Sequence, residues 1–386
     1  MKLTVLGAGA IGSAVAHDLC RLDGVSRVQV CEAHPATLRA FRDAYAHPQV
    51  RAFEADARDE PTLAPIVEGS ACVVSCVDPE LNPALARLAL EAGAHFVELG
   101  SPGPVHDALA ELAPLAERRR RWVVTGAGLA PGLVGVLVHR GLGAVEAPTA
   151  ARVRVGDLPT DPREPFNYRL AHSAEKLLDD YTQPATVLRD GALEPREPLT
   201  GLELLSIGDF DGLEAFYSGG LSSLAETLAG RLDRLDAKTV RYAGHADQMR
   251  FVLALGLAER QTVDVRTHLS YRDVLLRRLR QRLGGAYRDA VVVRVEVEGQ
   301  RDGQAGTLVY ELVDRFDEAT GLTAMQRCTA FPAAAAARLL AEGQVPGGGV
   351  GAAETALPAE AVVAHLAARG VAVEERWEAA PVAQAA

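Results

Sequence analysis

Cysteine is scarce in this 386-residue chain, and its arrangement argues against disulfide or metal chemistry. There are five cysteines, an odd number, and no two of them form a Cys-x-x-Cys pair. Structural zinc sites need clusters of Cys and His at short spacings, and the sequence has none. The pattern indicates thiols used as small core residues in a reducing compartment, without a metal ion.

The chain also lacks a long apolar run. The longest one, around residues 126–138, is shorter than the roughly 20 residues that span a bilayer, and it contains Pro131. The N-terminus begins Met-Lys and passes directly into a strand-like run, so we expect no signal peptide. The sequence therefore predicts a cytoplasmic protein with no membrane partner.

An excess of positive charge is missing as well, since the formal net charge is −11. The only compact basic run, residues 118–121, falls where a helix should end, and cations are favoured there by the helix dipole. We therefore expect no nucleic-acid partner. A Gly-x-Ser-x-Gly elbow and a P-loop are both absent, and none of the three lysines follows a Tyr by four residues. These absences argue against a serine hydrolase, a P-loop enzyme and a short-chain dehydrogenase.

The first 125 residues alternate regularly between strand-like and helix-like segments. Short apolar runs predict buried strands at residues 3–6, 28–31, 50–53, 72–76, 95–98 and 122–125. Segments with helical periodicity lie between them, for example residues 11–22, 81–92 and 105–118. This alternation predicts an α/β fold: an N-terminal Rossmann domain with a doubly wound parallel sheet.

The alternation of strand-like and helix-like segments ends after about residue 145. The runs 291–298, 307–315 and 321–327 predict neighbouring antiparallel strands, which indicates a second, α+β domain. We place the dinucleotide-binding domain at residues 1–127, the second domain at 128–330 and a C-terminal segment at 331–386. That segment should contain a helix near residues 358–369 and end in disordered residues.

A Gly-x-Gly-x-x-Gly loop follows the first predicted strand and opens the first predicted helix. Gly7 permits the tight turn, Gly9 lets the backbone approach a pyrophosphate, and Gly12 lets the helix pack closely on the strand. The free N–H groups at the helix start, at Ala10 and Ile11, would face the phosphates. The loop therefore predicts a dinucleotide site.

Glu32 ends the second predicted strand, twenty residues after Gly12. A carboxylate at this position accepts hydrogen bonds from the adenine ribose hydroxyls and repels a 2′-phosphate. The next residues, Ala33 and His34, supply no arginine for such a phosphate. The arrangement favours NAD, while a flavin, another dinucleotide or a vestigial loop in a scaffold protein stays open.

Further candidates lie where the later strands end, because ligands bind at the carboxyl edge of such sheets. They are Asp56 and Ala57 after the third strand, Ser75, Cys76 and Val77 at the fourth, Glu98 at the fifth, and Gly128 after the sixth. We expect the pair after the third strand to meet the adenine and the group at the fourth to line the nicotinamide side.

Several motifs in the same order resemble the saccharopine dehydrogenase-like oxidoreductases, and among them the L-lysine 6-dehydrogenases. The motifs are residues 7–12, 98–100 (ELG), 128–132 (GLAPG), 178–185 (LDDYTQPA), 213–216 (LEAF), 238–245 (KTVRYAGH) and 323–330 (TAMQRCTA). The Arg-Tyr-x-Gly-His element and the Gly-x-x-Pro-Gly turn are the most specific of these. The chain departs from the lysine-type pattern at His172-Ser173, where those enzymes tend to have an aromatic residue before Ser.

The resemblance implies a Rossmann domain, a second domain for substrate binding and dimerisation, and a C-terminal segment that returns to the first domain. It implies an NAD-dependent enzyme that oxidises the ε-amine of L-lysine and releases ammonia. The product aldehyde, allysine, cyclises to piperideine-6-carboxylate. A homodimer with a small amino-acid or amine substrate is the expected assembly.

The chemistry assigns roles to particular side chains. A carboxylate near the nicotinamide can stabilise the iminium and relay protons, and Glu98 is the first candidate, with a purely structural acid as the alternative. In the family's Arg-Tyr-x-Gly-His element, Arg241 would bind the substrate carboxylate as a planar fork, unless it pairs with an acid between the domains. His245 could act as a base or a hydrogen-bond donor, although a structural histidine is the alternative. The candidate pocket residues are Tyr168, His172 and Phe216.

Two other functions stay open. A saccharopine dehydrogenase-type enzyme would make or cleave a secondary amine, and it would need room and a second cationic clamp for a glutamate moiety. A non-catalytic regulator would bind NAD without turning over any amine.

Overall fold

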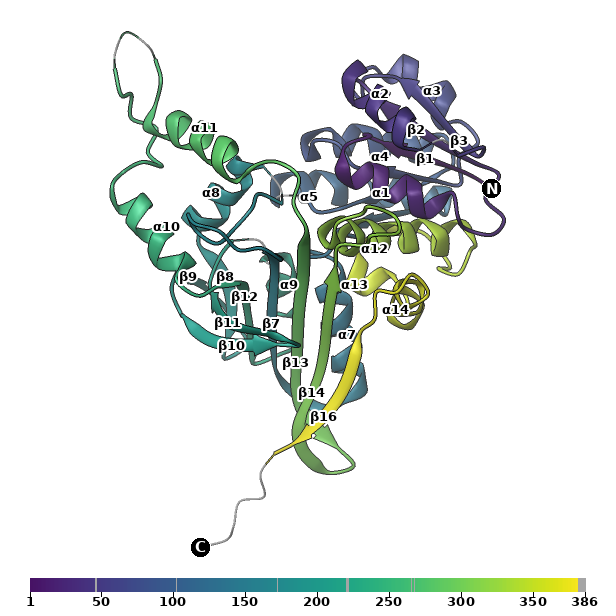
Figure 1. Cartoon of the computed structure of the whole chain (residues 1–386). Coiled ribbons are helices and arrows are strands. Elements are labelled where there is room, and N and C mark those ends of the chain that lie inside the picture. The colour runs from purple at the N-terminus through teal and green to yellow at the C-terminus, as the bar shows by residue number, and fades with distance from the viewer. Residues whose placement is uncertain are drawn as a thin grey trace, which may run out of the picture. The chain divides into compact units, whose positions relative to one another are not determined.

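The computed structural model describes residues 1–45, 47–101, 103–171, 173–219, 222–264, 266 and 268–380. The chain divides into two compact units, and each is discontinuous in sequence. The first unit combines Met1–Arg140 with Gln326–Ala372, and the second combines Gly141–Met325 with the chain from Val373 onward. Figure 1 follows both units along the colour gradient.

The first unit is built on a parallel sheet of seven strands in the order β15-β6-β5-β4-β1-β2-β3. The strands are β1 (Lys2–Leu6), β2 (Arg27–Glu32), β3 (Val50–Glu54), β4 (Cys72–Ser75), β5 (His95–Glu98), β6 (Trp122–Thr125) and β15 (Gly349–Ala352). The order reverses between β1 and β4, which is the switch point of a doubly wound sheet. The predicted fold class is confirmed for this unit.

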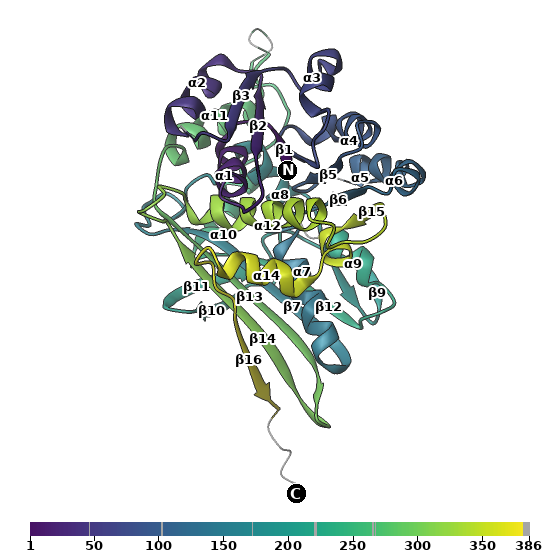
Figure 2. The same cartoon turned by 90° about the vertical axis from the view of Figure 1, so that its right-hand side faces the viewer.

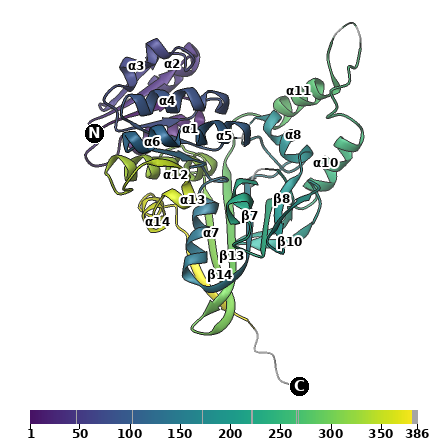
Figure 3. The ribbon, with the colours of Figure 1, turned by 180° about the vertical axis from the view of Figure 1, so that it is seen from behind.

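Helices cover the sheet because its central strands are buried on both faces. Those that pack on its strands include α1 (Ala10–Leu19), α2 (Pro35–Ala44), α4 (Asn82–Glu91), α5 (Gly103–Ala110), α6 (Ala113–Arg119) and α13 (Ala353–Ala356). The unit also contains α3 (Glu60–Val67), α14 (Ala359–Ala367), most of α12 (Ala324–Ala341) and a short 3₁₀ turn at Pro79–Leu81, and α7 (Leu133–Ala144) begins in it. In Figure 3, α4 and α6 lie against the sheet. Their core includes Leu85, Leu90, Phe96 and Ala116.

The second unit contains a mixed sheet in the order β10-β11-β12-β7-β13-β14-β16, with the β8–β9 hairpin attached to β12. Its strands are β7 (Glu146–Pro159), β8 (Ala185–Arg189), β9 (Ala192–Arg196), β10 (Glu203–Ile207), β11 (Phe210–Phe216), β12 (Arg234–Tyr242), β13 (Asp289–Arg301), β14 (Gln304–Arg315) and β16 (Glu374–Ala379). Figure 2 shows β13, β14 and β16 side by side. This sheet confirms the predicted second domain with mixed helices and strands.

The helices α8 (Ala174–Thr182), α9 (Ser222–Leu228), α10 (His245–Ala254) and α11 (Tyr271–Leu283) belong to the second unit. Aromatic and leucine side chains of α8, α10 and α11 share one core with Tyr168 and Phe216. The Ser270 hydroxyl and the Asp273 carboxylate form a reciprocal cap that fixes the start of α11.

The expected third antiparallel strand at residues 321–327 is wrong. Leu322 forms only an isolated bridge to Asp317, and the helix α12 begins at Ala324. The buried Asp289 carboxylate accepts hydrogen bonds from the N–H groups of Ala324 (2.7 Å) and Met325 (2.9 Å) and so starts the helix. The strand that pairs with β14 on the side away from β13 is instead β16.

Two other expected helices can be compared directly. The helix expected at residues 105–118 breaks into α5 and α6, whereas the helix expected at 358–369 is confirmed as α14. In the C-terminal segment, β15 joins the first sheet and β16 joins the second. The expected disorder of the last residues lies outside the described residues.

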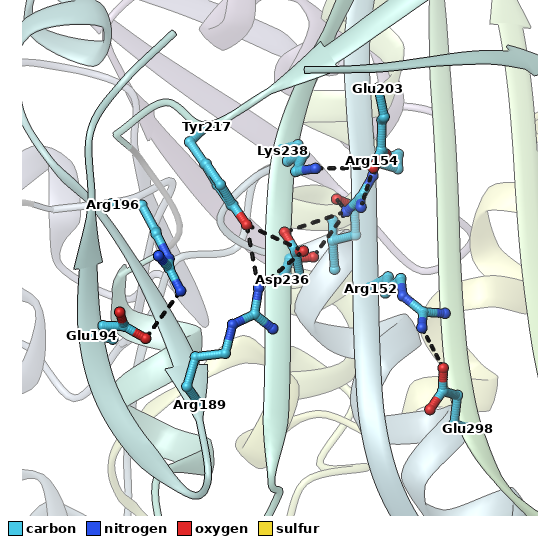
Figure 4. Close-up of polar contacts among 11 residues, drawn as sticks. Arg152, Arg154, Arg189, Glu194, Arg196, Glu203, Tyr217, Asp236, Lys238 and Glu298 are labelled. Carbon is cyan, nitrogen blue, oxygen red and sulfur yellow. Dashed lines mark hydrogen bonds and ion pairs between the residues drawn. The ribbon is translucent and has the colours of Figure 1, made fainter. Parts of the chain in front are cut away.

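One face of the second sheet carries a network of ion pairs, drawn in Figure 4. The side chains of Arg154 and Lys238 are only 7% exposed, and both contact the Glu203 carboxylate. Asp236 lies 3.7 Å from Arg154 and 3.6 Å from Arg189, and it accepts a hydrogen bond from the Tyr217 hydroxyl. Buried cations are thus neutralised within the sheet.

Candidate functional site

The glycine loop has the geometry of a phosphate-binding turn. Gly7 has φ = +92°, and a Cβ there would lie 2.7 Å from the Cys76 carbonyl oxygen. A Cβ at Gly12 would lie 2.0 Å from the carbonyl oxygen of Gly7, so the helix packs against the turn. A Cβ at Gly9 would meet no atom within 4 Å, which leaves the backbone open to a ligand at this point.

The helix that follows the loop begins without a side-chain cap. Gly9 is the N-cap of α1, no side-chain cap is formed within the described part of the chain, and the first turn has no acidic residue. Gly9 and Ala10 are exposed, Ile11 is half-buried and Gly12 is buried. Free N–H groups and the positive end of the helix dipole suit a pyrophosphate. The loop therefore fits a dinucleotide.

Glu32 lies at the end of β2, beside the loop. Its Oε2 accepts from the N–H of Ala8 (2.9 Å), and its Oε1 accepts from the N–H of His34 (2.8 Å). These two bonds hold the carboxylate at one place against the loop. The structure thus places a fixed negative charge next to the phosphate-binding turn, where the sequence predicted contact with the adenine ribose.

The remaining cofactor candidates occupy the same edge of the first sheet. Asp56 is exposed beyond β3, where it accepts from the N–H of Arg58 (2.9 Å), and Ala57 follows it. Ser75 is the last residue of β4, and Cys76 and Val77 continue from it to within reach of Gly7. That all of them bind the cofactor stays a prediction.

A buried hydrogen-bond network joins the ends of β4 and β5. The Ser75 hydroxyl donates to Asn82 Oδ1 (2.7 Å), and Asn82 Nδ2 donates to Glu98 Oε2 (3.3 Å) and to the Ser101 hydroxyl (3.1 Å). Ser75, Asn82 and Glu98 are all at most 3% exposed. Side chains from two neighbouring strands and the start of α4 are therefore held as one unit.

The Glu98 carboxylate is surrounded by donors. Besides Asn82, its Oε2 accepts from the N–H of Gly100 (2.8 Å) and the hydroxyl of Ser101 (2.8 Å), and its Oε1 accepts from the N–H of Gly126 (2.6 Å). Burial raises the pKa of Glu98, and these hydrogen bonds partly oppose that shift. Glu98 thus fixes the loops after β5 and β6, and Oε1, with one such bond, keeps the greater accepting capacity.

The Gly-x-x-Pro-Gly turn packs against these loops. A Cβ at Gly128 would lie 2.9 Å from the Leu99 carbonyl oxygen, and one at Gly100 would lie 2.8 Å from the ring of Pro131. Gly128 also bridges to Gly132, where α7 is about to begin. Glycine is required here because the turn and the loop after β5 touch through their backbones.

In the second unit, His245 is the centre of a buried aromatic cluster. The Glu214 carboxylate accepts from the N–H groups of Gly244 and Ala246 and thereby fixes the start of α10, where His245 lies. The imidazole of His245 stacks on Phe216, with ring centroids 6.1 Å apart and planes 9° apart. Tyr168 meets it edge-on at 5.4 Å.

Both ring nitrogens of His245 have partners. Nδ1 lies 3.0 Å from the carbonyl oxygen of Phe166, which can only accept, so Nδ1 carries the proton. Nε2 therefore accepts from the Tyr181 hydroxyl at 2.9 Å. Burial and the nearby Arg241 lower the pKa of His245 to about 3. The imidazole is neutral across the physiological range.

Arg241 forms a buried ion pair with Asp157. Nη1 of Arg241 lies 2.9 Å from Asp157 Oδ1, and each side chain is 6% exposed. The Arg241 guanidinium also lies over the Tyr168 ring, 4.5 Å from its centroid. Arg241 Nε, Asp157 Oδ2 and the Tyr168 hydroxyl are buried and have no hydrogen-bond partner among the described residues. The sequence left open whether this arginine pairs with an acid, and it does so inside the second unit.

The structure brings together three of the predicted substrate residues and the predicted catalytic residue His245. Tyr168, Phe216, Arg241 and His245 share the His245 cluster, although they come from segments as much as 77 positions apart. His172 lies outside the described residues. The substrate and catalytic roles assigned to these residues, and to Glu98, stay predictions.

Sequence reasoning missed Asp157, Tyr181 and Asn82. Tyr181 lies in the LDDYTQPA motif, and Asp157 is the one acid in the apolar stretch that ends β7, so both carried a signal. Asn82 follows a proline turn, and the sequence carried no signal for it beyond its position at the start of a predicted helix.

Two family models match the chain. The saccharopine dehydrogenase NADP binding domain matches residues 3–125, and the saccharopine dehydrogenase C-terminal domain matches residues 128–371. The chain belongs to the saccharopine dehydrogenase family. It is accordingly an NAD(P)-dependent oxidoreductase of that family, and the resemblance stated from its motifs is confirmed at the family level.

Solved structures agree on the fold. A saccharopine dehydrogenase (L-Glu forming) from Saccharomyces cerevisiae is 18% identical with a TM-score of 0.80, over 97% of this chain and 99% of that chain. A homospermidine synthase from Legionella pneumophila in complex with NAD is 12% identical with a TM-score of 0.69, over 100% of this chain and 93% of that chain.

Among the described residues, no group of three or more His, Cys, Asp or Glu side chains could hold a metal ion. No helix within the described ranges is long and apolar enough to span a bilayer.

Proposed function

We propose that this family member is an NAD-dependent dehydrogenase of an amino-acid side-chain amine, with L-lysine as the substrate. NAD⁺, when bound, would supply the acceptor for the hydride that leaves the carbon carrying the ε-amine. Water then adds to the iminium, and ammonia leaves to give allysine, which cyclises to piperideine-6-carboxylate. The motif resemblance to the lysine enzymes supports the choice of substrate.

The observation that carries the choice of cofactor is the anchored Glu32 carboxylate. Its two oxygens are held by Ala8 and His34 next to the glycine loop, so it cannot easily swing away from an incoming 2′-phosphate. Like charges brought together in this way cost several kcal/mol. This supports NAD over NADP, even though the matching family model takes its name from NADP.

The chain's own residues divide the work in this proposal. Gly9 and the start of α1 hold the pyrophosphate, and Glu32 holds the ribose. Glu98 Oε1 is the atom at which a proton would be taken up near the nicotinamide, since Oε2 already accepts three hydrogen bonds. A raised carboxyl pKa suits that task because it moves toward the working pH.

A spectrophotometric assay of NADH formation tests the proposal. It should use lysine, ornithine, saccharopine and polyamines as donors, each with NAD⁺ and with NADP⁺. Turnover of lysine with NAD⁺ is expected. Turnover of saccharopine alone, or reductive turnover that requires added glutamate, would favour the secondary-amine reaction. Tight NAD⁺ binding with no turnover of any donor would leave the non-catalytic NAD-binding regulator as the remaining alternative.

A matched pair of variants tests the role of Glu32. Glu32→Ser should raise the NADP⁺-to-NAD⁺ ratio of kcat/KM by about tenfold or more, since the repulsion removed with the carboxylate exceeds the roughly 1.4 kcal/mol that corresponds to a factor of ten. Glu54→Ser is the control, because Glu54 pairs with Glu32 across β2 and β3 and is exposed. An equal ratio in both variants would remove the argument for NAD.

We also propose a homodimer, on the family resemblance alone. Multi-angle light scattering of the purified chain tests it, with a monomer mass as the contrary result.

A further inference from the structure

The Ser75–Asn82–Glu98 network occupies the half of the first sheet that lies beyond its switch point. In the order β15-β6-β5-β4-β1-β2-β3, Glu32 ends β2 on one side of the reversal, and Ser75 and Glu98 end β4 and β5 on the other. A dinucleotide spans such a reversal with one mononucleotide on each side. With Glu32 on the ribose of adenine, the network faces the nicotinamide half.

Asn82 is the member that links the strand ends. It is the first residue of α4 and only 2% exposed. Its amide accepts from Ser75 and donates to Glu98 and Ser101, so all three amide bonds are directed inward. The Ser101 hydroxyl donates to Glu98 Oε2, so it must accept from Asn82 Nδ2, which fixes the orientation of the amide.

The network reaches backbone positions on both sides. Ser75 precedes Cys76, whose carbonyl oxygen limits the space at Gly7 of the glycine loop. Glu98 in turn holds the N–H groups of Gly100 and Gly126, at the ends of β5 and β6. One buried amide therefore sets the relative positions of three strand ends at the ligand edge of the sheet.

We infer that Asn82 is a positioning residue for the nicotinamide half of the cofactor site and for the Glu98 carboxylate within it. The inference rests on the proposed use of NAD. It assigns Asn82 no contact with the reacting atoms. The amide acts by holding Ser75 and Glu98 at their hydrogen-bonding distances.

Two substitutions disturb the network at different points. Asn82→Asp is nearly isosteric but replaces the donor that faces Glu98 Oε2 with a second carboxylate oxygen, so the two acids repel. Ser75→Ala removes only the hydroxyl at the other end of the amide. Both changes should shift the strand ends while leaving Glu32 and the start of α1 in place.

Isothermal titration calorimetry with NAD⁺ and with ADP-ribose separates the two halves of the site, because ADP-ribose lacks the nicotinamide. Asn82→Asp should weaken NAD⁺ binding by about tenfold, the equivalent of one charge-assisted hydrogen bond. Its affinity for ADP-ribose should stay within about twofold of that of the unchanged protein. Ser75→Ala should also weaken NAD⁺ binding. The double variant should bind NAD⁺ no more weakly than the single variant with the lower affinity.

Ser70→Ala is the matched control. Ser70 is buried just before the opposite end of β4, where its hydroxyl lies 2.8 Å from that of Thr4. Its replacement should change neither affinity, as shown by the same titrations.

Two results would overturn the inference: equal weakening of both ligands, or no change in either. If Asn82→Asp does not fold, as judged by circular dichroism, Ser75→Ala decides by the same criterion. Failure of the proposed function looks different: a missing turnover of lysine appears only in the NADH assay and leaves both affinities unchanged, whereas a preference for NADP would make both ligands bind weakly to the unchanged protein.

Discussion

The buried ion pair between Arg241 and Asp157 leads to a quantitative prediction. The charged atoms are 2.9 Å apart, and both side chains are 6% exposed. At an effective dielectric constant of about 20, unit charges at this distance attract by about 6 kcal/mol, most of which offsets their desolvation. Asp157→Asn keeps the shape but leaves a buried guanidinium without a counter-charge. We expect it to lower the free energy of unfolding by about 3–5 kcal/mol.

Urea unfolding followed by tryptophan fluorescence measures this loss of stability in the second unit. The chain has two tryptophans, and Trp377 lies in β16 of the second sheet, so a Trp122→Phe background isolates its signal. Adding Arg241→Met to Asp157→Asn removes the unpaired charge and should restore part of the loss.

A solvent-exposed ion pair supplies the control. Asp161 and Arg163 form a pair whose side chains are 69% and 67% exposed, so Asp161→Asn should cost at most about 1 kcal/mol. If Asp157→Asn cost no more than this control, the reasoning that places the guanidinium in a dry environment would be refuted.

Three other predictions use the same preparations. Gly12→Ala should lower the melting temperature, because its Cβ would lie 2.0 Å from a loop carbonyl, whereas Gly9→Ala should leave it unchanged and weaken NAD⁺ binding in calorimetry. The pKa of His245 is about 3 when folded and about 6.5 when unfolded, so stability should fall below about pH 6.5, by up to about 1.4 kcal/mol per unit. His245→Gln should flatten that slope in urea titrations across pH. Glu203→Gln should cost about 1–2 kcal/mol in the Trp377 assay, because Lys238 loses its carboxylate, while the Glu203 side chain is 35% exposed and Arg154 keeps Asp236.

The first sheet could be predicted from the sequence because its signals are local. Gly7, Gly9 and Gly12 are within six positions, and Glu32 follows at a fixed spacing, so chain geometry alone links them. The structure places Glu32 beside the loop, as this spacing requires.

The His245 cluster could be predicted only in part. Its candidates came from motifs, but the contacts of Asp157 and Tyr181 depend on how β7, α8 and β12 pack, and no local pattern encodes that packing. The error at residues 321–327 has the same origin. An apolar run there suggested a strand, and Asp289, 35 positions from Ala324, turns it into the start of a helix.

The position of β15 affects how the chain can fold during synthesis. β15 completes the edge of the first sheet beside β6, and Trp122 Nε1 donates to the carbonyl oxygen of Pro346, 224 positions later. Asp18 of α1 contacts His365 across 347 positions. A ribosome must therefore release nearly the whole chain before the nucleotide-binding unit can close. Until then the edge of β6 is unpaired and can associate with other chains. The unit whose synthesis begins first is therefore among the last to complete its fold.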